Sequence, residues 1–125
     1  MADPEDYVRR IEFQYLDLPD LPRVRRMSFF LTTRQIIDRE KTVTRRSVDT
    51  WTTLKAGDRV IAIEKGQGLK AGEGHLVLAL LEIVNVRIER LDEITAEECV
   101  REGFPDLTPA EFVTFYRRAK KDQKA

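Results

Sequence analysis

The chain has 125 residues, of which 42% are hydrophobic and 35% are charged, and its 22 basic and 22 acidic side chains give a formal net charge of zero. This length suits one domain with its own hydrophobic core, and zero net charge excludes the overall electrostatic pull of a strong non-specific nucleic-acid binder. The single cysteine, Cys99, excludes an internal disulfide and a cysteine-rich zinc site, so we expect no metal and no cofactor. Without a membrane-length apolar run or a signal peptide, we expect a cytoplasmic protein with no membrane partner.

The first half of the chain predicts three strands and one short helix. Apolar and polar residues alternate over 11–16, so we expect residues 1–24 to form an N-terminal arm that contains one strand. Residues 27–31 are apolar enough for a core strand, and a short helix is expected over 34–39. The β-branched residues within 41–46 then favour a further strand.

The next part of the chain predicts two strands joined by a loop. Residues 59–64 form an apolar strand, and 65–74 contain four of the six glycines, which indicates a flexible hairpin loop. Residues 75–90 are the longest strand-like run: 76–81 are apolar on both faces, and apolar residues continue from 83 with charges between them, over a length that exceeds the usual strand. We therefore expect a bend or bulge near 82–85, or one long strand that curls round a barrel.

Two helices are expected at the C-terminal end. Thr95 is placed to cap the first helix, with Glu98 completing a capping box, and Gly103 is placed to end it. Pro109 suits the first position of the second helix. The apolar stripe of that helix, interpreted as core packing, consists of Phe112, Phe115, Tyr116 and Ala119. Residues 120–125 are expected to be a basic tail.

The mixed order of strands and helices predicts an α+β fold. We expect a small curved sheet or β-barrel of five to six strands with short flanking helices, spanning residues 25–119.

Charge is distributed unevenly along the chain. Residues 23–46 contain eight basic and two acidic side chains, a net charge of +6, whereas 82–111 contain nine acidic and three basic ones, a net charge of −6. A compact fold can pair these charges with one another, or it can leave a basic face opposite an acidic one.

The segment 41–46 is the strongest candidate for a functional site. In a regular strand its side chains would alternate between two faces, with Lys41, Val43 and Arg45 on one and Thr42, Thr44 and Arg46 on the other. Paired guanidinium groups suit a phosphate or a carboxylate. The alternative is a solvated edge strand whose cations prevent aggregation.

Several of these segments together resemble the ASCH domain family of the PUA-like superfamily. The resemblance covers about residues 27–116 and rests on Phe29-Phe30, the short helix, 41–46, Trp51, 54–58 and 94–104. It implies a small β-barrel with a cleft that binds RNA or a nucleotide. Lys41 and Arg46 match the charged positions of the family motif, and Arg39 stands where glycine is usual.

Within this family, the chain also resembles the small bacterial amidohydrolases that deacetylate N4-acetylcytidine, and this implies Lys41, Thr44 and Glu102 as catalytic residues. Thr44 is a weak nucleophile that needs a base. A partly desolvated Lys41 could be that base or could stabilise an oxyanion, and Glu102 could pass the proton to the leaving amine. Because Lys41 and Thr44 would face opposite sides of a regular strand, this triad requires a twist or bulge at 42–43. The alternative is an ion pair of Lys41 with Glu102 that holds the helix to the strand.

Three functions follow. The first is an RNA- or nucleotide-binding module in which Lys41, Arg45 and Arg46 contact phosphate and Trp51 stacks on a base; with Thr44 and Glu102 these residues form the expected binding site. The second is an amidohydrolase that acts on an acylated cytosine nucleoside. The third is a protein-interaction module whose basic and acidic faces pair head to tail. The ligand and the oligomeric state are left open.

Overall fold

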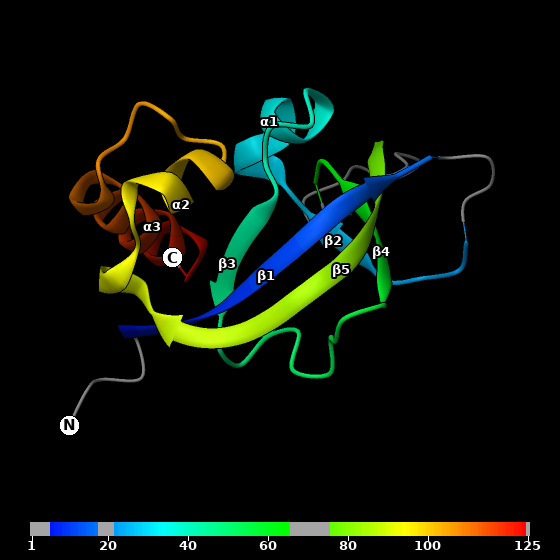
Figure 1. Ribbon diagram of the computed structural model, residues 1–125, viewed down its shortest axis with the longest axis horizontal. Coiled ribbons are helices and arrows are strands. Elements are labelled where there is room, and N and C mark those ends of the chain that lie inside the picture. The colour runs from blue at the N-terminus through cyan, green and yellow to red at the C-terminus, as the bar shows by residue number, and fades with distance from the viewer. Residues whose placement is uncertain (1–5, 18–21, 66–75, 125) are drawn as a thin grey trace.

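The structure is a computed structural model that describes residues 6–17, 22–65 and 76–124 (Figure 1). The expected glycine-rich loop lies outside the described residues from position 66 on. In chain order the elements are β1 (Tyr7–Leu16), β2 (Arg26–Ser28), η2 (Phe30–Thr32), α1 (Thr33–Ile37), β3 (Val43–Ser47), β4 (Arg59–Ile63), β5 (Val77–Arg90), η3 (Leu91–Glu93), α2 (Ala96–Arg101) and α3 (Pro109–Lys124).

The strands form one five-stranded sheet in the order β2-β4-β5-β1-β3. The pairs β4/β5, β5/β1 and β1/β3 are antiparallel, and the pair β2/β4 is parallel. The α+β class expected from the sequence is confirmed. The sheet is not a closed barrel, since β2 and β3 are its two outer strands.

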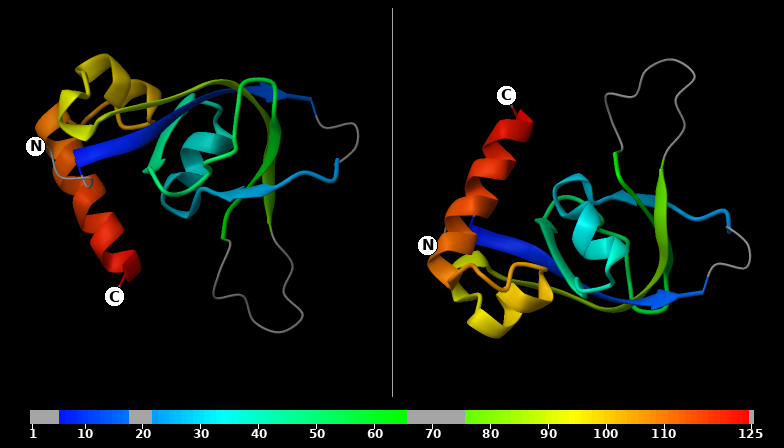
Figure 2. Two further views of the ribbon diagram at one scale, coloured as in Figure 1. Left: turned by 90° about the horizontal axis from the view of Figure 1, so that it is seen from below. Right: turned by 90° about the horizontal axis from the view of Figure 1, so that it is seen from above.

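The sheet is strongly curved, and the curvature follows from the irregular pairing of β5 (Figure 2). Glu12 pairs with Asn85 but Phe13 pairs with Ile83, so Val84 is an extra residue in β5. A β-bulge of this kind bends and twists the strand that contains it. The bend predicted from the length of the segment is therefore confirmed. It lets the long strand wrap round α1, which lies inside the curve.

β1 begins at Tyr7, four residues before the alternating pattern predicts, and it is an inner strand between β5 and β3. The sequence pattern missed this extension because Arg9 and Arg10 have no apolar character. Arg10 is nevertheless only 2% exposed. Its guanidinium binds the Glu98 carboxylate, and this pairing allows a charged side chain to be buried in the sheet.

The segment after β2 differs from the prediction. The strand expected over 27–31 ends at Ser28, and Phe30–Thr32 forms a 3-10 helix that continues directly into α1. α1 ends at Ile37, two residues before the expected end, and Arg39 has a left-handed backbone with φ of +57°. Arg39 therefore makes, without a glycine, the turn that follows the helix.

The two C-terminal helices pack together where β1 begins and β5 ends (Figure 1). The Thr95 side chain accepts a hydrogen bond from Glu98 N at 3.1 Å, as a cap should. The second half of the expected capping box is wrong, because the Glu98 carboxylate binds arginines instead. α3 continues to Lys124, through residues that the sequence analysis assigned to a basic tail.

The buried side chains form two main clusters. One lies between the sheet and α1 and includes Phe13, Phe29 and Ile36, and the other joins β1 to α2 and α3 and includes Val8 and Phe112. Burying a side chain of this size contributes about 1.5–3 kcal/mol, so these clusters fix the helices on the sheet. In the described part of the chain no helix has the length and apolar character needed to cross a bilayer.

Candidate functional site

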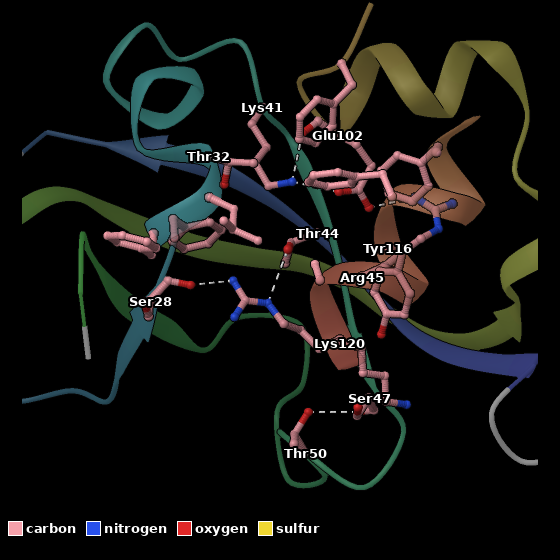
Figure 3. Close-up of a pocket in the computed structure, with 18 of the residues that line it drawn as sticks. Ser28, Thr32, Lys41, Thr44, Arg45, Ser47, Thr50, Glu102, Tyr116 and Lys120 are labelled. Atoms are coloured by element: carbon pink, nitrogen blue, oxygen red, sulfur yellow. Dashed lines mark hydrogen bonds and ion pairs between the residues drawn. The ribbon is translucent and has the colours of Figure 1, made fainter. Parts of the chain in front are cut away.

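A cavity of about 290 Å³ lies between η2, β3 and α3, beside the residue that follows α2 (Figure 3). Its lining includes all six residues that the sequence analysis selected for a ligand site: Lys41, Thr44, Arg45, Arg46, Trp51 and Glu102. They come from three separate parts of the chain, so the fold brings together what the sequence holds far apart.

Lys41 reaches this cavity because it precedes β3 and does not belong to it. The expected strand over 41–46 is found at Val43–Ser47. Before it, Lys41 N donates to Gln35 O at 3.2 Å, and the Tyr15 hydroxyl donates to Lys41 O at 2.6 Å. The strict alternation of a strand therefore does not apply to Lys41, and its side chain lines the same cavity as Thr44 without a bulge at 42–43 (Figure 3).

The Lys41 ammonium is buried against Glu102. Its side chain is 2% exposed, and Nζ donates to Glu102 Oε1 at 2.7 Å and to Glu102 O at 2.8 Å. Burial lowers the pKa of Lys41, because an apolar environment disfavours the charged amine. The Glu102 carboxylate opposes this effect, and the positive charges of Arg46 and Arg45 add to it. Lys41 thus gives up its proton more readily than a lysine in water.

Glu102 bridges two cations. While Oε1 accepts from Lys41, Oε2 accepts from Arg45 Nη1 at 2.9 Å. The carboxylate is brought to this place by a close contact between α1 and the end of α2. Gly103 has φ of +97°, and a Cβ there would lie 2.7 Å from Gln35 Cγ. Only glycine fits this approach without a shift of the neighbouring segment.

Thr44 is held by Arg46. The Thr44 side chain accepts a hydrogen bond from Arg46 Nε at 3.2 Å, and Arg46 Nη2 donates to Ser28 O at 2.7 Å. The Arg46 guanidinium also lies 4.9 Å from the centre of the Phe29 ring. Burial lowers the pKa of Arg46 to about 10, so it stays positively charged at neutral pH. Its charge is placed to stabilise negative charge that develops on the threonine oxygen.

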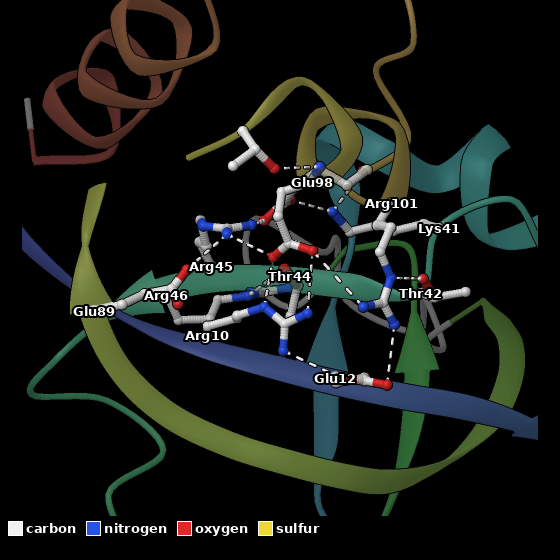
Figure 4. A network of polar contacts seen from close by, with 12 residues as sticks. Arg10, Glu12, Lys41, Thr42, Thr44, Arg45, Arg46, Glu89, Glu98 and Arg101 are labelled. Atoms are coloured by element: carbon white, nitrogen blue, oxygen red, sulfur yellow. Dashed lines mark hydrogen bonds and ion pairs between the residues drawn. The ribbon is translucent and has the colours of Figure 1, made fainter. Parts of the chain in front are cut away.

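Arg45 lines the cavity and also contacts two carboxylates that do not line it (Figure 4). Its side chain is 1% exposed, and Nη2 donates to Glu89 at 2.7 Å and to Glu98 at 2.8 Å. Burial by itself raises the pKa of Glu98, but hydrogen bonds from Arg10 and Arg45 outweigh it and hold that pKa at about 2. The basic and acidic segments of the sequence therefore meet within one molecule at this cluster.

Trp51 packs against the main core cluster and also lines the cavity. Its backbone is left-handed, with φ of +55°, a conformation that costs a bulky residue energy and persists only where its surroundings hold it. The Arg25 guanidinium lies 4.8 Å from the centre of its ring. Both interpretations of Trp51, closure of the core and contact with a ligand, are compatible with this position.

The sequence analysis missed most of the apolar wall. Seven of the lining residues are aromatic: Phe29, Phe30, Trp51, Phe104, Phe112, Phe115 and Tyr116. Helical spacing identified the stripe on α3 correctly as inward-facing, and Phe112 is indeed 2% exposed. Spacing alone does not separate residues that meet other side chains from those that meet a hollow. Lys120, from the last turns of α3, also lines the cavity.

Within the described ranges no group of three or more His, Cys, Asp or Glu side chains is arranged to hold a metal ion. The charged groups that line the cavity are two lysines, two arginines and one glutamate, and serine and threonine hydroxyls and the Tyr116 hydroxyl add to its polar lining. These groups can bind a polar ligand and can move a proton. Comparison of the chain with known protein families, with curated proteins and with solved structures gave no match.

Proposed function

We propose that this protein is an amidohydrolase that removes an acyl group from the exocyclic amine of a cytosine-type nucleoside. The observation that carries the proposal is that Lys41, Thr44 and Glu102, three buried residues, line one cavity. A volume of about 290 Å³ is at the small end of ligand pockets, so it suits a single base or nucleoside. The aromatic wall suits a flat ring.

The pairing of the charges also favours this function over phosphate binding. Lys41, Arg45 and Arg46 all have partners inside the protein, and Arg45 contacts three carboxylates. A phosphate would have to displace those partners. An acyl amide carries no charge and needs a nucleophile and a base, and the cavity offers both.

The resemblance to the ASCH family is part of this proposal, as are a fold related to the PUA-like barrels and a cytoplasmic location. Arg39 stands where the family motif has glycine, and its φ of +57° is a conformation that glycine adopts readily. The turn of the motif is therefore kept despite the different residue, which supports the match of Lys41 and Arg46 to the charged positions.

The proposed reaction uses each of these groups in turn. Neutral Lys41 uses its two hydrogens on Glu102, so its lone pair can take the Thr44 proton. Thr44 Oγ1 then forms a bond to the acyl carbon, while the charge of Arg46 stabilises the negative charge that develops on the threonine oxygen as it loses its proton. The carbon–nitrogen bond breaks, and the proton passes from Lys41, with Glu102 as relay, to the leaving amine. Water hydrolyses the resulting threonine ester to free the acid and restore the hydroxyl.

The direct test is incubation of the purified protein with N4-acetylcytidine, followed by chromatography for cytidine. We expect turnover by the wild type and its loss in Thr44→Val, which removes the hydroxyl. Thr42→Val is the matched control, since the Thr42 hydroxyl accepts from Arg101 at 3.2 Å and does not line the cavity. Absence of cytidine with the wild type would refute the proposal.

Binding of RNA or a nucleotide without turnover is the second candidate. The half-buried Trp51 at the cavity favours it, because base stacking on an aromatic ring contributes about 1–3 kcal/mol. In that case Trp51→Leu should weaken binding of short single-stranded RNA in a fluorescence titration at low salt. Arg45→Ala with Arg46→Ala should weaken it as well, through lost phosphate contacts.

A further inference from the structure

A row of alternating charges runs from β1 to the cavity, and three of its five members line the cavity. It leads from Arg10 on β1 to Glu98 on α2, then to Arg45 on β3, to Glu102 after α2, and finally to Lys41 (Figure 4). Every link has a donor-to-acceptor distance between 2.5 and 2.9 Å. Four of the five side chains are less than 5% exposed, and Glu98 is 15% exposed.

A buried row of ion pairs contributes little net free energy to the stability of a fold. Desolvation of buried ions costs about as much as their attraction returns, and apolar residues of similar size often stabilise a protein equally well. Stability alone therefore does not explain why these buried positions are charged. The row ends at the one amine that the proposed reaction requires as a base, and this position suggests a role in the chemistry.

Arg45 controls how the Glu102 carboxylate meets Lys41. Arg45 Nη1 takes Oε2, so Oε1 alone is left to the lysine amine. Without Arg45, both oxygens and the whole negative charge would face Lys41. No other acidic side chain of the described residues lines the cavity. Arg46 on β3 is the other charge that acts on Lys41, and the Tyr15 hydroxyl on β1 donates to the Lys41 carbonyl. The polar groups that line the same cavity include Thr32 on η2, Thr44 on β3, and Tyr116 and Lys120 on α3.

We propose that Arg45 is a positioning residue for the Lys41–Glu102 pair: it fixes the carboxylate and takes up part of its charge, so that Lys41 can reach the neutral form. This inference rests on the proposed function, which needs neutral Lys41 as the base. Glu98 and Glu89 in turn hold the guanidinium in place. The direction agrees with the lowered pKa of Lys41, to which Arg45 contributes.

The test is an NMR titration of the lysine side chains, which follows protonation of Lys41 without any turnover. We compare the wild type with Arg45→Gln, and use Arg87→Gln as the matched control. Arg87 pairs with the same Glu89, but its side chain is 55% exposed and it does not line the cavity. We expect Arg45→Gln to raise the titration midpoint of Lys41 by about one pH unit, a tenfold loss of neutral amine below the midpoint. Arg87→Gln should leave the midpoint unchanged.

Activity provides the second readout. If acetylcytidine is hydrolysed, kcat/KM should rise with pH as Lys41 loses its proton. In Arg45→Gln this rise should shift to higher pH by the same amount as the titration midpoint of Lys41, so high pH should restore the rate. A merely structural defect would lower the rate at every pH. Arg45→Lys keeps the positive charge but lacks the planar guanidinium that binds several oxygens at once. It should therefore bring the titration midpoint of Lys41 part of the way back to the wild-type value.

An unchanged Lys41 midpoint in folded Arg45→Gln would overturn the inference. Should that variant not fold, the charge-balanced variant Arg45→Gln with Glu89→Gln carries the same expectation, because Glu89 is 23% exposed and does not line the cavity. If Arg45→Gln raises the titration midpoint of Lys41 but the wild type makes no cytidine, the proposed function is refuted and the role of Arg45 in setting the protonation of Lys41 stands.

Discussion

Gly103 and Gln35 lie so close together that a methyl group on the glycine would meet the glutamine side chain, at 2.7 Å from Cγ and 2.9 Å from Cβ. The contact joins α1 to the end of α2, and Gln35 Nε2 also donates to Gly103 O at 3.2 Å. Because Glu102 directly precedes this glycine, the same contact sets the position of the carboxylate in the cavity.

We expect Gly103→Ala to lower the free energy of unfolding by about 2–4 kcal/mol, the sum of overpacking and of left-handed strain. Urea denaturation measures this loss. Gly57→Ala is the control, since Gly57 has φ of +92° but nothing within 4 Å of an added Cβ. It should cost only the backbone strain, about 1–2 kcal/mol. Equal losses in the two variants would show that the contact with Gln35 carries no energy.

Arg39 should respond differently to glycine and to alanine. Its backbone is left-handed, and its guanidinium lies 5.4 Å from the centre of the Tyr15 ring. Both substitutions lose the ring contact, but only glycine relieves the strain. Arg39→Gly should therefore be more stable than Arg39→Ala by about 1 kcal/mol in urea denaturation. If alanine were the more stable of the two, the turn would not have the conformation described above.

Stability should fall in acid through Glu98. Its pKa is held at about 2 in the folded protein, below the ordinary value of 4.5, so the unfolded chain binds the proton more readily. The contribution of Glu98 is thus complete above pH 4.5 and is lost as the pH falls toward 2. Urea midpoints between these pH values should drop more steeply for the wild type than for Glu98→Gln. Glu93→Gln, at a side chain that is 72% exposed, should follow the wild type.

Loss of the Lys41 amine should slow turnover strongly without removing the ion pair of Glu102 with Arg45. Lys41→Met removes the amine but keeps an unbranched side chain only one atom shorter, and Glu102 still binds Arg45. We expect kcat to fall by about 10²–10⁴, the usual contribution of a general base, as measured by cytidine release. Lys120→Met is the comparison: this lysine also lines the cavity but makes no described contact with Glu102, so a smaller effect is expected, mainly on KM. Equal losses of kcat in both variants would contradict the assignment of Lys41 as the base.

The sequence predicted the elements well where apolar residues set the pattern. The bend in β5 was predicted from the length of its strand-like run, and β4 lies within one residue of the expected strand. The pattern failed where charged residues are buried. Arg10 and Arg45 look solvated in the sequence, and only the carboxylates of Glu98 and Glu102, far along the chain, explain why both are inside.

The candidate site was predicted only in part for a similar reason. The set Lys41, Thr44 and Glu102 came from a family resemblance, whereas strand alternation alone placed Lys41 and Thr44 on opposite faces. The start of β3 at Val43 depends on hydrogen bonds that the preceding residues donate to α1 and α2, such as Lys41 N to Gln35 O at 3.2 Å and Thr42 N to Arg101 O at 2.8 Å. Contacts between distant segments of this kind leave no signal in the spacing of residues.

The place of β1 in the sheet has a consequence for any shortened form of the protein. β1 is hydrogen-bonded to β5 along one side and to β3 along the other. A chain beginning at residue 25 would retain the residues that carry the family resemblance, but it would lack β1. The edges of β5 and β3 that pair with the ten residues of β1 would then have no partner strand. It would also lose Arg10, which binds Glu98 at the end of the charge row that is farthest from the cavity. We therefore expect a stable fragment to need β1, which lies before the residues 27–116 that carry the family resemblance.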